Sequence, residues 1–321
     1  AAAGSAAGSA ALQALVNIST VPAVCEELLE LSAVRRVCEA MRGGWLEGRS
    51  GLVHWYAMLL ANLTTSPKGQ EAACTDDAML RFLLAAFVTK QRPPPRDGYD
   101  DPLLFLGKVV GNVCALELGR RALAGGDQGT ASATALAKEL KDRARRPDVV
   151  AALRNLCLDV ECHAALIGAD VFAAMAPFLF PVSAERAALP EDVAAALAAD
   201  GAALTGDGTV RFASAICILG LCRSADGRAY LRSRGAVEVI RAWRSEEADE
   251  ETRNALDTSA PTLAEEGPAA EEAPEDTSTA GGAQVVGDAP PRVTQGPLPA
   301  RDPAAGSGEG ELVELFAGIE D

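Results

Sequence analysis

A short apolar phrase with one polar residue inside it recurs along the chain. In four copies asparagine interrupts the apolar residues, and these copies centre on Asn17, Asn62, Asn112 and Asn155. A fifth copy has Gly220 at the position of the asparagine. The steps between copies are 45, 50, 43 and 65 residues, whereas helical repeats of the armadillo and HEAT kind are about 40–47 residues long. The pattern therefore predicts stacked helical repeats.

A glycine follows the recurring position by seven residues in three copies, at Gly69, Gly119 and Gly227. Glycine at such a place is typical of a helix end, where a left-handed residue closes the last turn. Further helical phrases with an apolar stripe come next, most clearly at 227–235 and 236–243. The glycines therefore predict that each repeat contains a helix, a glycine turn and another helix.

These repeats predict an all-α fold, an armadillo/HEAT-like right-handed superhelical solenoid of about five helical repeats over residues 1–265. A run of prolines predicts a loop near 90–102. Small and polar residues predict a second loop near 125–133, and we expect a charged helix after it, at 135–146. An insertion at 182–208 accounts for the longest step, and a Leu-Pro pair followed by acids inside it is typical of a helix start.

The composition changes after the repeats. Residues 266–310 are rich in proline, glycine, alanine and acids and poor in apolar anchors, so they predict a disordered acidic linker. Residues 311–321 regain an apolar stripe among acids and predict a short acidic amphipathic segment. Such a segment could dock on a partner or back on the repeats.

Composition and charge exclude several classes of protein. Apolar residues make up 49% of the chain and aromatic residues only 4%, which favours helices over a β-sandwich and disfavours base stacking. Residues 1–244 hold 26 acidic and 26 basic residues, whereas residues 245–321 hold 19 acidic and 3 basic ones, which accounts for the net charge of −16. A neutral body with an acidic tail predicts no nucleic-acid partner and no anionic membrane partner.

The start of the chain and its cysteines bear on the compartment. The alanine-rich start lacks a basic segment, so it is not a secretory signal, and the missing initiator methionine indicates a fragment or a trimmed start. No apolar run is long enough for a membrane span. Eight cysteines are spread singly through apolar runs, which predicts free thiols in a reducing compartment rather than a disulfide framework.

Cysteine and histidine occur in the chain, but not at the spacings that a metal site or a catalytic pair requires. Cys157 and Cys162 are five residues apart, about 140° around a helix, so we expect them to diverge rather than bind a metal. The chain has two histidines, His54 and His163, and no glycine-rich phosphate loop. We therefore expect no catalytic residue, no cofactor and no metal, and an enzyme with a cryptic thiol site remains the minor alternative.

The recurring asparagine needs a reason, because asparagine is unfavourable inside helices. It can bond the backbone of a neighbouring repeat, or it can hold the main chain of an extended ligand, and the two are compatible. The candidate positions for partner binding or inter-repeat contact are Asn17, Asn62, Asn112, Arg154, Asn155, Asp159, His163 and Arg211.

Several segments in order resemble one family. The phrases at 12–19 and 58–64 match its early repeats, and 153–163 matches its Leu-Arg-Asn signature followed by histidine, although Leu156 and Leu158 replace a cysteine and a phenylalanine there. A proline-bounded apolar block and a later repeat also match, at 176–181, 189–190 and 227–243. Over residues 11–265 the chain therefore resembles the Hgh-type family of armadillo-like eukaryotic proteins.

This resemblance implies a function that the residues alone do not name. It implies a cytoplasmic, non-enzymatic adaptor co-chaperone that links newly made translation elongation factor two to the chaperonin TRiC/CCT. We expect a monomer. The alternative is an armadillo-type scaffold or transport adaptor that binds linear peptide motifs of other proteins.

Overall fold

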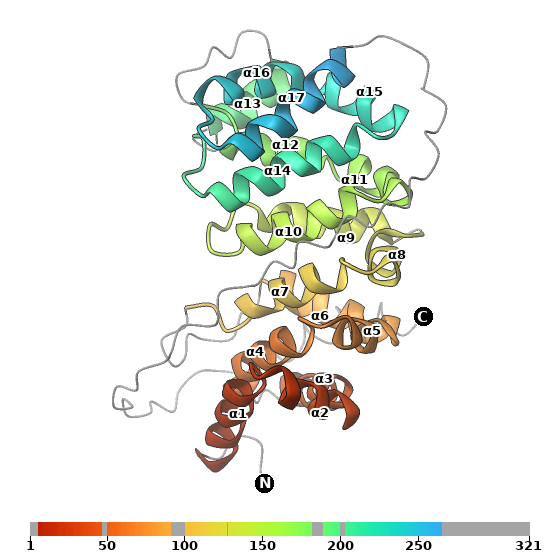
Figure 1. Cartoon of the computed structure of the whole chain (residues 1–321), viewed down its shortest axis with the longest axis vertical. Helices are drawn as coiled ribbons and strands as arrows, with labels where there is room; N and C mark the ends of the chain where they lie inside the picture. Colours follow the sequence, from red (N-terminus) through yellow and green to blue (C-terminus); the bar gives the residue numbers. More distant parts are fainter. Residues whose placement is uncertain are drawn as a thin grey trace.

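The computed structural model describes residues 6–46, 50–90, 100–126, 128–181, 189–199 and 203–264, and these ranges contain helices and no strand. Six helices, here called the ladder helices, stack on one another along the long axis of the molecule (Figure 1). They are α1 (Ala6–Ile18), α4 (Val53–Leu63), α7 (Leu104–Val113), α10 (Arg146–Cys157), α14 (Gly208–Leu221) and α17 (Glu250–Ala264). The prediction of an all-α solenoid is confirmed.

Two further helices precede each ladder helix after the first. Along the chain, α1 is therefore followed by five repeats of three helices each. These are α2 (Pro22–Glu30) and α3 (Ala33–Leu46), α5 (Pro67–Cys74) and α6 (Asp77–Val88), α8 (Glu117–Ala124) and α9 (Gly129–Glu139), α11 (His163–Gly168) and α12 (Val171–Met175), and α15 (Ala225–Ser233) and α16 (Ala236–Glu246). The fourth repeat also contains α13 (Glu191–Ala199). Short 3-10 turns lie at Ser50–Leu52, Val160–Cys162 and Ala176–Phe178.

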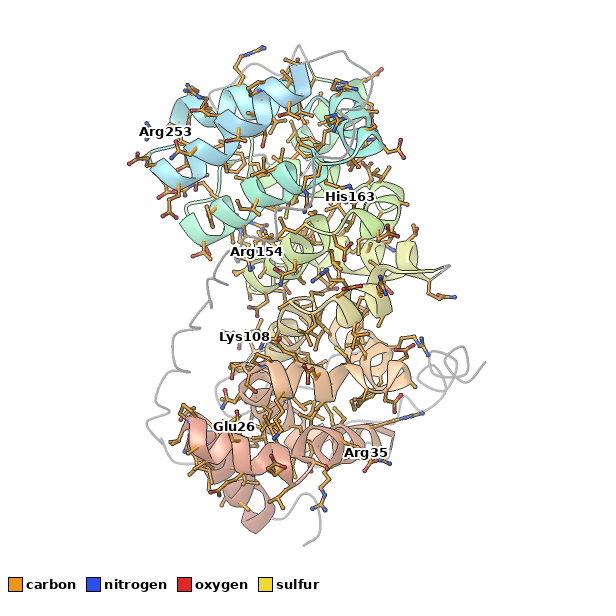
Figure 2. The ribbon with its side chains drawn as sticks, turned by 45° about the vertical axis from the view of Figure 1, so that its right-hand side comes forward. Glu26, Arg35, Lys108, Arg154, His163 and Arg253 are labelled. Carbon is orange, nitrogen blue, oxygen red and sulfur yellow. The ribbon has the colours of Figure 1, made fainter. Side chains whose placement is uncertain are left out.

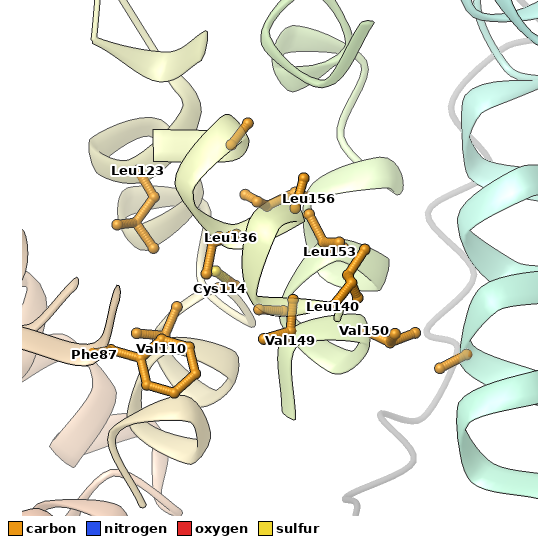
Figure 3. Close-up of a cluster of buried hydrophobic side chains, with 14 of the residues drawn as sticks. Phe87, Val110, Cys114, Leu123, Leu136, Leu140, Val149, Val150, Leu153 and Leu156 are labelled. Atoms are coloured by element: carbon orange, nitrogen blue, oxygen red, sulfur yellow. The ribbon is translucent and has the colours of Figure 1, made fainter. Parts of the chain in front are cut away.

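The hydrophobic core runs through the whole stack and is shared between neighbouring repeats. Figure 3 shows one section of it, where side chains of α6, α7, α8, α9 and α10 meet. Phe87, Val110, Leu136 and Leu153 are fully buried there. Burial of one such side chain stabilises the fold by about 1.5–3 kcal/mol. Each repeat therefore depends on its neighbours for stability.

The three glycines of the repeats begin helices rather than end them, so the prediction of helix stops is wrong. Gly69, Gly119 and Gly227 each lie in the first turn of α5, α8 or α15 and do not have the left-handed conformation. A Cβ at these positions would lie 1.7, 2.1 and 2.0 Å from the carbonyl oxygens of Leu63, Val113 and Leu221. Glycine is required because the new helix packs directly on the end of the preceding ladder helix.

The expected loop near 125–133 is too long and the expected helix at 135–146 is misplaced. Helix α9 begins at Gly129, and its small residues let it pack closely against α8, α11 and α12. Helix α9 ends at Glu139, and the turn that follows it places the side chain of Arg145 in the core.

Arg145 joins two repeats through buried ion pairs. Its side chain is fully buried and contacts Asp101 at 2.7 Å and Glu139 at 2.8 Å. It also donates to the carbonyl of Phe87 and lies 4.6 Å from the centre of that ring. A buried guanidinium needs this set of acceptors, because an unpaired charge would oppose folding strongly.

The remaining boundaries fall partly outside the described residues. Most of the expected loop near 90–102, parts of the insertion 182–208, the linker 266–310 and the segment 311–321 lie there. Among the described helices, no single one has both the length and the apolar character to cross a membrane. Two sharply bent helix pairs reach that length and composition together.

Candidate protein-binding face

The recurring asparagines occupy the same place on consecutive ladder helices, near the C-terminal end of each. We call Asn17, Asn62, Asn112 and Asn155 the asparagine ladder. Asn17 is exposed and the other three are half-buried. The ladder therefore runs along a partly open face of the stack.

Each inner asparagine donates to the preceding ladder helix. Asn62 Nδ2 lies 3.0 Å from the carbonyl oxygen of Val16 and 2.9 Å from Ser19 Oγ. The same bonds recur one repeat later, where Asn112 Nδ2 lies 3.1 Å from Thr64 Oγ1 and 3.4 Å from the carbonyl oxygen of Ala61.

Each asparagine position of the ladder is called a rung. The rung at Asn155 makes one such inter-repeat bond and also accepts a hydrogen bond. Asn155 Nδ2 lies 3.1 Å from the carbonyl oxygen of Gly111. Its Oδ1 accepts from Arg154 at 3.3 Å. Inter-repeat bonding is thus one role of these asparagines.

The ladder still offers unused polar atoms. Within the described part of the chain, Asn62 and Asn112 use only their Nδ2 donors, and the side chain of Asn17 has no hydrogen bond. The Oδ1 atoms of Asn62 and Asn112 can therefore accept a backbone N–H of another chain while the inter-repeat bonds stay in place.

Two cations lie beside the inner rungs. Lys108 is exposed and stands one helical turn before Asn112 on α7, and Arg154 precedes Asn155 on α10. Figure 2 shows Lys108 and Arg154 on the same side of the stack. Asp148 is half-buried at the start of α10, and burial raises its pKa to about 6 while Lys108 opposes the shift.

Asp159 belongs to a joint between repeats rather than to the ladder. Its carboxylate accepts from Arg120 Nε at 2.8 Å and from the backbone N–H of Glu161 at 3.2 Å. Burial would raise its pKa, but the hydrogen bond and charge of Arg120 hold it below the usual value. Arg120 also donates to the carbonyls of Cys114 and Ala115, so this pair ties the start of α8 to the end of α10.

His163 is buried between the fourth and fifth repeats. Its Nε2 lies 2.8 Å from the carbonyl oxygen of Cys157, and its Nδ1 lies 2.6 Å from Ser224 Oγ. A carbonyl can only accept, so Nε2 carries the proton and Nδ1 accepts from the serine. Ser224 in turn accepts from the N–H of Gly227 at the start of α15. Burial lowers the pKa of His163, so the neutral ring fastens one repeat to the next.

Arg211 is also structural. It donates to Glu247 from Nε at 2.8 Å and to the carbonyl of Thr205 at 2.9 Å. Glu247 accepts from Trp243 Nε1 as well, at 2.7 Å. Burial would raise the pKa of Glu247, but these donors lower it. The network fixes the turn between α16 and α17 against α14 and leaves Arg211 little capacity for a partner.

The thiols in the described part of the chain are mostly buried. Seven of the eight free cysteines are buried, and Cys74 is half-buried. Burial raises the pKa of Cys38 to about 12 and that of Cys162 to about 11, which leaves little thiolate at neutral pH. Among the described residues, no group of three or more histidine, cysteine, aspartate or glutamate side chains is placed to hold a metal ion.

Comparison with known proteins places the chain in a family. Residues 45–205, just over half of the chain, match the family described as Domain of unknown function (DUF383). The chain belongs to this family. The sequence matches none of the curated proteins with which it was compared.

The DUF383 chain is also similar to solved structures of armadillo repeat proteins. A designed armadillo repeat protein in complex with the peptide (KR)4 aligns with a TM-score of 0.58 at 14% identity, covering 80% of this chain and 92% of that one. Computationally designed armadillo repeat proteins for modular peptide recognition align with a TM-score of 0.59 at 14% identity, covering 79% and 92%. An engineered protein aligns with a TM-score of 0.60 at 14% identity, covering 80% of this chain and 90% of that one. These likenesses show the armadillo fold.

Sequence reasoning located the rungs but missed several residues that define the face. Ser19 and Thr64, which accept from the asparagines, follow their own rung by two residues, so the repeat alignment could have indicated them. Lys108 could have been found as the residue four before Asn112, on the same helical face. Arg145 had no such signal, because its partner Asp101 is 44 residues away.

Proposed function

We propose that this chain is a non-enzymatic protein-binding adaptor whose asparagine ladder receives an extended segment of another protein. The observation that carries the proposal is the ladder itself, with free Oδ1 acceptors on Asn62 and Asn112 at successive rungs. Asparagine gains nothing from helix propensity at these positions, and an extended peptide has unpaired backbone N–H groups to donate. The armadillo fold supports the same conclusion, since it stacks repeats into an extended surface.

We further propose that the client is translation elongation factor two, that the second partner is the chaperonin TRiC/CCT, and that the adaptor works in the cytoplasm. This finer proposal is supported by the resemblance to the Hgh-type family over residues 11–265. The DUF383 match at 45–205 lies inside that region.

Purified components test the finer proposal. The full chain is mixed with elongation factor two, with the chaperonin, and with both, and the mixtures are analysed by sedimentation velocity. The expected result is a binary complex with the elongation factor and a ternary complex with both. No complex with either protein would contradict the choice of client.

A ladder variant tests whether this face is used. Ala151 lies half-exposed on α10, next to Gly111. Ala151→Gln adds bulk without charge and keeps helix propensity, so we expect client affinity to fall about tenfold, as for a central contact. Ala229→Gln on α15, at an exposed site away from the ladder, is the matched control. Equal affinity of both variants would place the client elsewhere.

A second function, a scaffold that binds linear peptide motifs of other proteins, is favoured by the likeness to designed armadillo proteins for peptide recognition. A peptide array probed with the full chain and with Ala151→Gln tests it. Peptide binding that the variant loses, together with no binding of the elongation factor, would select this function.

A further inference from the structure

The five ladder helices that lie within residues 1–244 are basic, although that part of the chain is neutral as a whole. The sixth, α17, holds three acids and one base. Helices α1, α4, α7, α10 and α14 together contain four cations and one acid, which are Lys108, Arg146, Arg154, Arg211 and Asp148. Residues 1–244 as a whole hold 26 charges of each sign. The compensating acids of the body therefore lie on the other helices and turns.

Two of these four cations are available to a partner. Arg211 is engaged by Glu247. Arg146 lies 4.5 Å from the ring centre of Phe178 and donates to the carbonyl of Leu140. Lys108 makes no ion pair or hydrogen bond with described residues, and Arg154 donates only to its neighbour Asn155.

The positions of the two free cations define a short binding track. Lys108 and Asn112 share one side of α7, and Arg154 and Asn155 lie on α10, whose Asn155 contacts Gly111. The unused Oδ1 acceptor of Asn112 and the two cations thus lie on two adjacent rungs. This chemistry fits an extended segment that carries carboxylates.

The chain itself contains a segment rich in carboxylates. Residues 309–321 have five acids, Glu309, Glu311, Glu314, Glu320 and Asp321, and no basic residue. Apolar residues between the acids could contact the aliphatic stems of Lys108 and Arg154. Opposite charges on the two parts of one chain favour their association.

The intervening chain is long enough to reach the ladder. Residues 265–308 number 44, and a random coil of that length has an end-to-end distance of about 35–40 Å. The path from α17 through α14 and α10 to α7 is three packed steps of about 8–10 Å each. An attached segment then acts at an effective concentration in the millimolar range, so weak contacts suffice.

We propose that residues 309–321 bind the asparagine ladder of their own chain at Lys108 and Arg154, and that a client must displace them. The intramolecular contact stands without the proposed function, whereas the competition rests on it. The occupied ladder is an autoinhibited form, and raising the ionic strength shifts the chain towards the open form.

Carbodiimide crosslinking of the full chain tests the contact. The reagent joins a lysine amine to a nearby carboxyl group, and the chain has five lysines. In dilute monomeric protein at low salt, we expect mass spectrometry to find Lys108 joined to a carboxyl of 309–321. Lys138, exposed on α9 and away from the ladder, is the control site. Crosslinks at Lys108 no more frequent than at Lys138 would overturn the proposal. So would crosslinks found only between isotopically labelled and unlabelled copies.

A labelled synthetic peptide of residues 309–321 gives a second readout in trans. We expect it to bind the full chain with Glu311→Gln, Glu314→Gln and Glu320→Gln at least tenfold more tightly than the unmodified chain, because the neutralised tail leaves the ladder open. Adding Lys108→Glu and Arg154→Glu to that chain should weaken the peptide about tenfold, whereas adding Lys138→Glu should not. Equal binding to all of these chains would overturn the proposal. Matching melting temperatures are required for the comparison.

Client binding separates this inference from the proposed function. If the tail crosslinks to Lys108 and elongation factor two does not bind even the tail-neutralised chain, the contact stands and the client is wrong. If the client binds and the crosslink is missing, the proposed function stands and the tail contact is wrong.

Discussion

Polar side chains at the joints between repeats are held by hydrogen-bond partners on the neighbouring repeat. Asn112 Nδ2 donates to Thr64 Oγ1 and to the carbonyl oxygen of Ala61, and the Thr64 hydroxyl donates in turn to the carbonyl oxygen of Leu60. Thr64 is fully buried, so the loss of one of these hydrogen bonds leaves a buried polar group without a partner. Asn112 inside the stack and Asn17 at its end therefore contribute different amounts to the stability of the fold, although both are asparagines.

Removing single rungs should show that difference. We expect Asn112→Ala to lower the free energy of unfolding by about 1–2 kcal/mol, because Thr64 and Ala61 lose a donor. Asn17→Ala should change it by less than about 0.5 kcal/mol, because the Asn17 side chain is exposed. Urea denaturation followed by circular dichroism measures both. Equal losses would mean that the inter-repeat bond contributes nothing beyond side-chain replacement.

The buried histidine should make stability depend on pH. Because burial lowers the pKa of His163 below its ordinary value of 6.5, the unfolded chain binds more protons than the folded one just below that pH. Stability then rises with pH in this window and is lost as the pH falls below about 6.5. Asp148, whose pKa is raised to about 6, acts in the opposite sense. The measurement is therefore the difference between wild type and His163→Gln in urea melts from pH 5 to 8. The variant should lose less stability on acidification, and parallel curves would contradict the role of His163.

At the scale of the element, the repeats are joined by helix ends in direct contact. The carbonyl at the end of α4, α7 or α14 lies where a Cβ of the third residue of the next helix would be. A serine caps two of these helices, since Ser66 and Ser224 accept from Gly69 and Gly227. The serine satisfies a free N–H of the first turn, and the glycine allows the close approach.

Substitution of one glycine in this joint should therefore be severe. Gly119→Ala would place a Cβ 2.1 Å from the carbonyl oxygen of Val113, and we expect it to lower the free energy of unfolding by about 2–4 kcal/mol. Gly111→Ala is the matched control, because its Cβ would meet nothing nearer than 3.7 Å. In the control, better helix propensity should stabilise the chain by up to about 1 kcal/mol. Thermal melts compare the two, and a neutral Gly119→Ala would contradict the close approach.

The repeats could be predicted because the signal is local. Each rung carries its asparagine inside one short phrase, so the period of the phrase reports the period of the fold. The role of Gly119 could not be predicted, since glycine is equally compatible with a helix end and with close contact, and the contacting carbonyl belongs to another helix. The turn before α10 was missed for a similar reason, because Arg145 is held by Asp101, which is distant in sequence.

At the scale of the whole molecule, the described helices pack mainly against helices of their own and the adjacent repeats. Among the described elements, α3 packs against α2, α4, α5 and α6, whereas α17 packs against α14, α15 and α16. Stability of such a stack is approximately a sum of repeat terms and nearest-neighbour terms. The acidic segment proposed to fold back on the ladder would add a contact between distant parts of the chain, and it would do so without joining the core.

A cavity at one end of the stack should therefore stay a local defect. Met41 is fully buried in α3, and Met41→Ala should destabilise its surroundings by about 2–5 kcal/mol. Hydrogen exchange read by mass spectrometry should then speed up in α1 to α4 and remain unchanged in α14 to α17, because α3 and α17 share no main packing partner. Trp243→Ala, at a fully buried site in α16, is the mirror control and should loosen the other end. Faster exchange along the entire chain in either variant would show one cooperative unit and contradict the nearest-neighbour account.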